Sequence, residues 1–308
     1  MNTAALQAAG CAILEREPLS HHTTFQLGGP CKLFIGCAKP EQLQLAVGEL
    51  HRAGENFELL GGGSNVLASD AGLTCAVLCY QAAQPLIEHT HDVLTVSGST
   101  LLDDIAAYAV RAGLGGMEMF SGIPGTLGGA IAGNAGAYGQ HIGDVVESVT
   151  LLDRAGRARQ AAQAELHFAY RSSALHTSGE IVSSARLRLH TGDAAALAHQ
   201  RHECLAIRQE KHPQWRTTPT AGSFFRNVAP TSAAGKRQAA GWFLEQAGAL
   251  EMRCHGACPF GKHANIIIRD GPCTAKDVLD LSRRMADAVA QKFALTLERE
   301  VRLLGPFA

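Results

Sequence analysis

Three features that would place a protein in a class at once are missing from this sequence. Its 308 residues contain no uninterrupted apolar run of the roughly 18 residues that cross a bilayer. Residues 1–18 lack the basic segment and following apolar segment of a secretion signal. Charge of one sign is not in excess, because 27 Lys and Arg stand against 28 Asp and Glu. We therefore expect a cytoplasmic protein that binds neither membranes nor nucleic acids, although a few local cations suffice to bind a small anion.

Cysteine shows no pairing pattern. The nine cysteines are odd in number and lie scattered along a chain that is too long to need disulfides for its stability. We therefore expect reduced thiols. With 46% apolar and 18% charged residues the composition is that of a globular protein, and the length allows two or three domains of about 100–200 residues.

Apolar periodicity indicates an α+β chain. Short apolar runs alternate with glycine turns from about residue 20 to 85, with one helical stretch over 41–53. A second part begins near Leu86 and contains a helix over 101–112, whose apolar residues share one face. The run SVTLLD at 148–153 then indicates a strand.

The last third of the chain has its own helices. A helix over 195–210 ends near Pro213, and the Thr- and Pro-rich segment 215–222 is typical of a hinge. Thr274 and Asp277 form a capping-box pattern at the start of a helix predicted over 275–293. These breaks predict a division into three parts: 1–85, 86–205 and 206–296.

Glycine is the most informative residue type. Of 33 glycines, 16 fall between Gly61 and Gly143, within the motifs LLGGGSNVL at 59–67 and SGIPGTLGGAIAGNAGAYG at 121–139 and around them. Such a block indicates a segment shaped around a flat or phosphorylated ligand, although a turn-rich β domain would also contain one. Neither motif follows the pattern G-x-G-x-x-G, so a Rossmann fold is excluded.

Other segments resemble known sites only superficially. Residues 256–262 read G-x-x-x-x-G-K, but His263 stands where a P-loop needs Ser or Thr, and a strand-like run follows instead of a helix. Four neighbouring side chains are possible zinc ligands: Cys254, His255, Cys258 and His263. Their spacing matches no common zinc pattern, and we expect no metal. By strand alternation, His89 and His91 lie on one solvated face.

Three polar residues stand in unexpected apolar surroundings. Arg171 follows two aromatic residues in FAYRSS, Ser223 precedes two phenylalanines in AGSFFRN, and Glu300 lies in LEREVRLLG. Alternation over Leu297–Leu303 places Glu300 on the polar face of a strand, opposite the apolar side chains. From periodicity alone these residues are surface residues, and Ser223 is equally typical of a turn.

Read together, seven segments in a fixed order resemble the UDP-N-acetylenolpyruvoylglucosamine reductase family, flavoenzymes of peptidoglycan precursor synthesis. The segments are TTFQLGGP at 23–30, LLGGGSNVLASDAG at 59–72, SGIPGTLGGAIAGNAGAYG at 121–139, YRSS at 170–173, GSFFRN at 222–227, AAGWFLEQAG at 239–248 and LEREVRLLG at 297–305. The glycine motifs alone would indicate only the wider flavin superfamily that includes vanillyl-alcohol oxidase.

The resemblance implies a fold, a cofactor and partners. The fold is α+β, with a two-lobed FAD-binding domain of the vanillyl-alcohol-oxidase/PCMH type, a C-terminal α+β substrate-binding domain, and residues 297–308 returning to the flavin. The implied cofactor is non-covalent FAD, the co-substrate is NADPH and the substrate is a UDP-sugar. The enzyme is expected to be a monomer. The rivals are a sugar or lactone oxidase of the same superfamily and a non-catalytic flavin- or nucleotide-binding protein.

The resemblance also implies residue roles. Arg171 and Glu300 are the expected stabilisers of the enolic intermediate, Ser223 the proton donor, and Arg226 and Asn227 the substrate contacts. The expected FAD contacts are Gly61, Gly62, Gly63, Ser64, Asn65, Gly122, Ile123, Pro124, Gly125, Thr126, Gly128, Gly129, Ala130, Asn134 and Gly136.

The chemistry is consistent with these residue types. Reducing an enol ether conjugated to a carboxylate needs a hydride that no side chain supplies, hence a nicotinamide and a flavin. Charge then develops in the carboxylate, which a guanidinium such as that of Arg171 stabilises, as would a protonated Glu300. A hydroxyl such as that of Ser223 delivers the proton to the adjacent carbon.

One departure from the better-known subgroup stands out. That subgroup inserts a tyrosine-bearing loop between the arginine and serine motifs, whereas only 51 residues, none of them tyrosine, separate Arg171 from Ser223. We therefore expect the shorter, loop-less subgroup. In it, Lys262, His263 and Asn265 are candidates for covering the nicotinamide and the sugar.

Overall fold

The computed structural model describes residues 1–230 and 237–307, and confirms the α+β class. The chain divides into two compact units. The first unit comprises Met1–Arg16, Lys32–Gly62 and Thr74–Arg208, and the second comprises Glu17–Cys31, Gly63–Leu73 and the chain from Gln209 onward. The division into 1–85, 86–205 and 206–296 stays a prediction.

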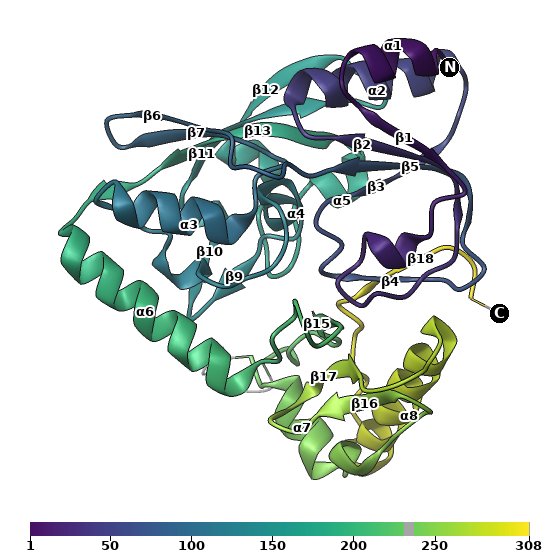
Figure 1. Cartoon of the computed structure of the whole chain (residues 1–308). Coiled ribbons are helices and arrows are strands. Elements are labelled where there is room, and N and C mark those ends of the chain that lie inside the picture. Colours follow the sequence, from purple (N-terminus) through teal and green to yellow (C-terminus); the bar gives the residue numbers. More distant parts are fainter. Residues whose placement is uncertain (231–236, 308) are drawn as a thin grey trace. The chain divides into compact units, whose positions relative to one another are not determined.

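Two main sheets organise the first unit (Figure 1). One has the order β1-β2-β5-β3, formed by β1 (Ala12–Glu15), β2 (Cys31–Cys37), β5 (Leu73–Tyr80) and β3 (Phe57–Leu60). The other is antiparallel with the order β12-β11-β13-β7-β6, formed by β12 (Ala158–Ala162), β11 (Val146–Leu152), β13 (Ile181–Arg188), β7 (Val93–Ser97) and β6 (Ile87–Thr90). Two short ladders accompany them: β8 (Leu114–Gly115) with β14 (His190–Thr191), and β9 (Gly136–Ala137) with β10 (Gln140–His141).

Helices bury the apolar faces of these sheets. The helices of this part are α1 (Thr3–Ala8), α2 (Pro40–Arg52), α3 (Leu102–Arg111), α4 (Leu127–Ala132), α5 (Leu175–Ser178) and α6 (Ala194–Lys211), whose last three residues belong to the second unit. Helix α4 packs against β7 and β13, and its Leu127 joins Ile105 of α3 and Leu187 of β13 in one fully buried cluster. The helices predicted over 41–53, 101–112 and 195–210 are confirmed as α2, α3 and α6.

The second unit combines a small antiparallel sheet with two helices. The sheet has the order β15-β17-β16, formed by β15 (Thr220–Ser223), β17 (His263–Arg269) and β16 (Ala257–Phe260). Helix α7 (Ala240–Gln246) packs against β17, and α8 (Ala275–Phe293) packs against β16 and α7. The parallel pair β4 (Val66–Ala68) and β18 (Arg302–Leu304) completes the unit.

Helix α8 confirms its predicted bounds and start. The Thr274 hydroxyl accepts from Asp277 N at 3.1 Å, and the Asp277 carboxylate accepts from Thr274 N at 2.8 Å. The apolar residues at helical spacing are fully buried: Val278, Leu281, Met285 and Val289. The capping box and the apolar stripe therefore act together to define this helix.

Two strand expectations were wrong in detail. Among the described residues after α8, the strand is limited to β18 (Arg302–Leu304). Glu300 is half-buried rather than solvated, since its segment bonds to that of Phe224. His91 lies in the turn after β6 at φ +54°, so strand alternation does not relate it to His89, although both are exposed.

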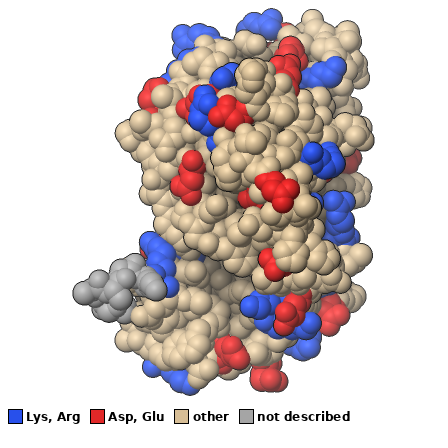
Figure 2. Space-filling view, turned by 90° about the vertical axis from the view of Figure 1, so that its left-hand side faces the viewer, with Lys and Arg blue, Asp and Glu red and all other residues tan. Residues whose placement is uncertain are grey.

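The surface features agree with the composition. Figure 2 shows basic and acidic side chains interspersed over the face it presents, without a large area of one sign. Among the helices that the structure describes, none has the length and apolarity needed to cross a bilayer. All nine cysteines, each among the described residues, are free thiols.

Candidate functional site

The two glycine motifs meet inside the first unit. A Cβ added to Gly61 would lie 2.5 Å from Thr126 Oγ1, and one added to Gly62 would lie 3.0 Å from Gly125 Cα. Such distances leave no room for a side chain, so the close approach of these loops requires glycine at both positions. The sequence separates these loops by about sixty residues, and the fold places them in contact.

Backbone hydrogen bonds hold the second glycine motif against neighbouring loops. Leu127 N donates to Thr100 O and Gly128 N donates to Gly98 O, each at 2.9 Å. The buried Thr126 hydroxyl accepts from Gly129 N at 3.5 Å and caps α4, which carries Gly128, Gly129 and Ala130. Ile123 and Pro124 lie in the half-buried segment before it. The start of the motif is therefore held in place by backbone hydrogen bonds and by the cap of α4.

Three buried polar atoms at this motif have no hydrogen-bond partner among the described residues: Ser121 Oγ, Gln140 Oε1 and Arg208 Nε. Arg208 extends from α6 beside Gly122, and its guanidinium carbon lies 5.9 Å from the centre of the Tyr138 ring. Burial lowers the pKa of Arg208. Because a buried polar atom without a partner is costly, these atoms and the glycine cradle fit a bound FAD, which brings polar groups of its own.

Arg171 lies beside the same motif. Its guanidinium Nη1 donates to Gly136 O at 3.1 Å. Arg171 occupies a left-handed conformation, at φ +51°, in a turn where Ala169 and Ser172 exchange backbone hydrogen bonds of 3.0 and 3.2 Å. The turn is held by Asn134, whose amide donates to Ala169 O at 2.9 Å and accepts from Gly143 N at 3.1 Å. A non-glycine residue in this conformation is strained, which is common at functional sites.

In the second unit, the rest of the first glycine motif contacts the segments of Ser223 and Glu300. Thr24 N donates to Gly63 O at 3.1 Å, while the Thr24 hydroxyl donates to Thr220 O at 2.6 Å. The Asn65 amide donates to Glu300 O at 3.2 Å, and Arg302 N donates to Asn65 O at 3.0 Å. Thus Asn65, expected to contact FAD, also fixes the backbone of Glu300.

Ser223 and Glu300 lie on paired segments. Ser223 is the last residue of β15 and pairs with Ile266 of β17. One residue further, Phe224 O accepts from Glu300 N at 2.8 Å, and Phe225 bridges to Arg299. Backbone hydrogen bonding therefore brings the two predicted catalytic residues of this unit to neighbouring positions.

The residues that follow Ser223 are already engaged within the unit. Arg226 N donates to Glu298 O at 2.8 Å, and the Arg226 guanidinium lies 3.7 Å from the Glu298 carboxylate. The Asn227 side chain accepts from Ala240 N at 3.2 Å at the start of α7. The substrate contacts expected of Arg226 and Asn227 stay predictions.

The three candidates near β17 differ in exposure. Lys262 is exposed, whereas His263 is half-buried, 5.5 Å from the His212 ring, and burial lowers its pKa. Asn265 is only 2% exposed, and its amide is bonded to the backbone of Phe225. The Asn265 side chain therefore holds the backbone of the Ser223 segment and does not face solvent.

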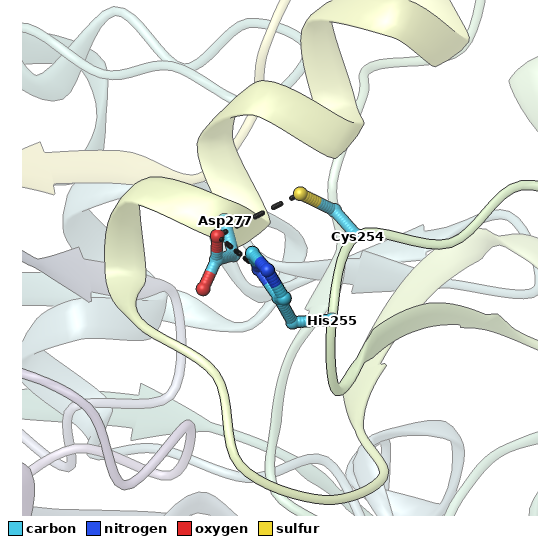
Figure 3. A group of neighbouring side chains, drawn as sticks. All are labelled: Cys254, His255 and Asp277. Atoms are coloured by element: carbon cyan, nitrogen blue, oxygen red, sulfur yellow. Dashed lines mark hydrogen bonds and ion pairs between the residues drawn. The ribbon is translucent and has the colours of Figure 1, made fainter.

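Within the described residues, one group brings three potential metal ligands together: Cys254, His255 and Asp277 (Figure 3). His255 Nδ1 lies 2.8 Å from Asp277 Oδ1, and Cys254 Sγ donates to the same oxygen at 3.7 Å. Hydrogen bonds from Thr274, and then the one from His255, lower the pKa of Asp277 to about 2. The role of the Asp277 carboxylate in capping α8 explains its position without a metal ion. Cys258 and His263, the other two possible zinc ligands considered from the sequence, lie outside the group.

The structure thus brings the predicted residues together in two clusters. In the first unit, Arg171 joins Gly136 and Asn134; in the second, Ser223 and Glu300 join Asn65. Sequence reasoning gave no role to Thr24 or Ser121, although they lie within the motifs TTFQLGGP and SGIPGTLGGAIAGNAGAYG, nor to Arg208, which lies in no motif.

Comparisons with known proteins identify the family of the chain. Residues 31–162 match a family model described as an FAD binding domain, and residues 212–304 match the C-terminal domain of UDP-N-acetylenolpyruvoylglucosamine reductase. The UDP-N-acetylenolpyruvoylglucosamine reductases of Moorella thermoacetica and Heliobacterium modesticaldum are each 36% identical over 95% of this chain, and over 93% and 90% of their own lengths. The crystal structure of UDP-N-acetylenolpyruvylglucosamine reductase from Thermus caldophilus is similar at 30% identity, with a TM-score of 0.79, over 96% of this chain and 100% of that one. The chain therefore belongs to the UDP-N-acetylenolpyruvoylglucosamine reductase family.

Proposed function

We propose that this chain reduces UDP-N-acetylglucosamine enolpyruvate to UDP-N-acetylmuramate, with NADPH as reductant and FAD as bound cofactor. Family membership supports the reaction. The observation that supports particular catalytic residues is the hydrogen bond from Glu300 N to Phe224 O, which joins the segments of Glu300 and Ser223. A second bond, from the Asn65 amide to Glu300 O, connects these segments to the glycine motif.

The reaction adds a hydride and a proton across the carbon–carbon double bond of the enol ether. FAD, which the glycine loops around Gly62 and Gly125 would hold, would supply the hydride chemistry that no side chain provides. A proton is needed at the adjacent carbon, and the enzyme must supply it from a side chain. The overall change consumes one NADPH and one proton for each double bond reduced.

The glycine loops are the proposed FAD site. Residues 61–65 and 122–136 would hold the cofactor mainly through backbone amides, since their close packing leaves few side chains there. The unsatisfied hydroxyl of Ser121 and the Arg208 guanidinium are polar groups that the cofactor or substrate would complete.

The proposed catalytic residues act on the developing carboxylate charge and on the proton. The Arg171 guanidinium offers paired, directional hydrogen bonds to the substrate carboxylate, and the Glu300 carboxyl, when protonated, donates another. The Ser223 hydroxyl delivers the proton to the carbon next to the carboxylate. Arg226 and Asn227 are the proposed contacts to the UDP-sugar.

Three finer properties belong to the same proposal. The short connection between Arg171 and Ser223, which contains α5, β13, β14 and α6 and no tyrosine, supports the loop-less subgroup. The nine free thiols support a reducing, cytoplasmic setting. The enzyme is proposed to act as a monomer.

The visible spectrum of the purified protein tests the function. We expect the absorption of oxidised flavin, loss of that absorption when NADPH is added without oxygen, and its recovery when UDP-N-acetylglucosamine enolpyruvate follows. UDP-N-acetylmuramate should form in a one-to-one ratio with the NADPH consumed, as measured by mass spectrometry.

Two results would overturn the proposal. A protein that stays colourless after incubation with FAD would not use the proposed cofactor. Rapid formation of hydrogen peroxide by the reduced protein in air, with no response to the enolpyruvyl sugar, would indicate an oxidase instead.

A further inference from the structure

Strand β15 contains an irregularity immediately before Ser223. Thr220 pairs with Ile268 of β17 and Ser223 pairs with Ile266, so two residues on β15 lie opposite the single residue Ile267. Gly222, at φ +74°, takes the conformation that this bulge requires. A bulge redirects the side chain that follows it and interrupts the ladder. The orientation of Ser223 therefore depends on other contacts that fix its strand.

Thr220 fixes the chain before the bulge. Its hydroxyl donates to Ile267 O at 2.7 Å and accepts from Gly222 N at 3.1 Å. Thr220 is 4% exposed, so these bonds are shielded from water.

Asn265 fixes the chain after Ser223. Its amide oxygen accepts from Phe225 N at 2.9 Å, and its amide nitrogen donates to Phe225 O at 2.8 Å. Its own backbone oxygen accepts from Phe224 N at 2.7 Å. The side chain thus reproduces the pair of bonds that a neighbouring strand would make, and only a coplanar donor and acceptor, as in an amide, satisfies both backbone groups of Phe225.

The same two phenylalanines contact the Glu300 segment. Phe224 O accepts from Glu300 N, and Phe225 bridges to Arg299. A continuous set of hydrogen bonds therefore runs from Asn265 through Phe224 and Phe225 to Glu300. Loss of the Asn265 amide would leave buried Phe225 with two unsatisfied backbone groups and would loosen the residues on which Ser223 and Glu300 depend.

We propose that Asn265 is a positioning residue, which sets the place of the Ser223 hydroxyl relative to Glu300 without touching the substrate. This inference rests on the proposed function, since it assigns Asn265 to the step in which Ser223 delivers the proton. Misplacement by about 1 Å is enough to slow such a step by roughly 100-fold.

The test separates the two halves of the catalytic cycle in Asn265→Ala and Asn265→Asp. Rapid mixing with NADPH measures flavin reduction, and mixing of the reduced protein with the enolpyruvyl sugar measures flavin reoxidation. We expect flavin reduction to change less than twofold and reoxidation to slow by about 10- to 100-fold. A larger solvent deuterium isotope effect on reoxidation should accompany the loss, because proton delivery becomes rate-limiting.

The aspartate variant gives a signature that a merely structural role would not. A protonated carboxylic acid carries one donor and one acceptor, as the amide does, whereas the carboxylate has no donor for Phe225 O. Reoxidation in Asn265→Asp should therefore recover toward the wild-type rate as the pH is lowered. Asn265→Ala should show no such recovery, and the comparison remains available if Asn265→Ala does not fold.

Ser282→Ala is the matched control. Ser282 is 3% exposed in the same unit, and its hydroxyl donates to Leu279 O within α8 instead of to residues 223–225. We expect this variant to lose stability while both half-reactions keep their rates.

The outcomes separate the two proposals. Wild-type protein that is not reoxidised by the enolpyruvyl sugar would overturn the proposed function. Wild-type protein that is reoxidised, with Asn265 variants equally fast at every pH or slowed equally in both half-reactions, would overturn the positioning role alone.

Discussion

In the first unit Arg171 lies in a turn, whereas in the second unit Ser223 and Glu300 lie on paired backbone segments. The turn of Arg171 is strained at φ +51° and depends on the side chain of Asn134. The segments of Ser223 and Glu300 bond directly to each other and to β17. Both arrangements use a buried asparagine, 5% exposed at Asn134 and 2% exposed at Asn265. The second arrangement is also held by the pairing of strands β15 and β17.

The difference suggests a division of tasks. A guanidinium that binds a carboxylate reaches out on a long side chain, so a turn is sufficient to place it. A serine hydroxyl is short, and its position is fixed almost entirely by its backbone. The residue with the shorter side chain accordingly has the more extensively bonded backbone.

The largest effect is expected from Ser223→Ala. Removal of the hydroxyl leaves the backbone pairs intact and takes away the proposed proton donor. Flavin reduction by NADPH should keep its rate, and reoxidation by the enolpyruvyl sugar should slow by at least about a thousandfold, or about 4 kcal/mol in the barrier. Rapid-mixing absorbance checks both rates, and a normal reoxidation rate would contradict the role of Ser223.

A smaller effect is expected from Gly61→Ala, which tests the first unit. The added methyl group would clash with Thr126 Oγ1 at 2.5 Å and push the two glycine loops apart. We expect a loss of about 1–3 kcal/mol in the free energy of unfolding and a lower content of bound FAD. Gly48→Ala is the control, because its nearest neighbour would be Arg52 Nη2 at 4.0 Å in helix α2; it should raise stability by about 0.5–1 kcal/mol and keep FAD.

Asn134→Asp compares the two buried asparagines directly. The aspartate can still accept from Gly143 N when ionised but cannot donate to Ala169 O, so the turn of Arg171 should loosen. We expect reoxidation to slow by roughly tenfold, or about 1.4 kcal/mol in the barrier. Hydrogen exchange should quicken at Ala169 and Ser172 and stay unchanged at Phe224 and Phe225; equal quickening in both places would show that the ladder gives no extra restraint.

The smallest effect is expected from Asp277→Asn, because this carboxylate caps helix α8 and has no role in the proposed chemistry. The folded-state pKa of Asp277 is lowered from 3.8 to about 2, so its stabilising contribution is present above pH 3.8 and is lost as the pH falls through about 2. The variant should lose about 1 kcal/mol of stability near neutral pH and show less acid sensitivity between these values. Thermal unfolding as a function of pH measures both, with Asp287→Asn as an exposed control on the same helix.

Local patterns predicted the parts of the fold that local forces determine. The capping box of Thr274 and Asp277 and the apolar stripe of α8 predict that helix to the residue, because the contacts that begin it lie within four positions. The glycine motifs predict segments whose backbone approaches a ligand closely, but the contact between the two motifs joins residues about sixty positions apart, which no local pattern encodes. Assignment of these loops to a flavin came from the family resemblance and not from the spacing.

The remaining features depend on partners that are distant in sequence. Glu300 is half-buried because its segment bonds to Phe224 and Asn65, which no period along residues 297–303 encodes. Asn265 looked like a polar residue available for a ligand, but its bonds to Phe225, 40 positions away, bury it. The carboxylate of Asp277 joins Cys254 and His255 only through the packing of α8 against the turn before β16.

The most direct test is a crystal structure of the protein with FAD and UDP-N-acetylglucosamine enolpyruvate bound. We expect the Arg171 guanidinium and the Glu300 carboxyl within hydrogen-bonding distance of the substrate carboxylate, with the Ser223 hydroxyl next to the carbon that receives the proton. Binding of the sugar with any of these three groups many ångströms from the enolpyruvyl moiety would contradict the account.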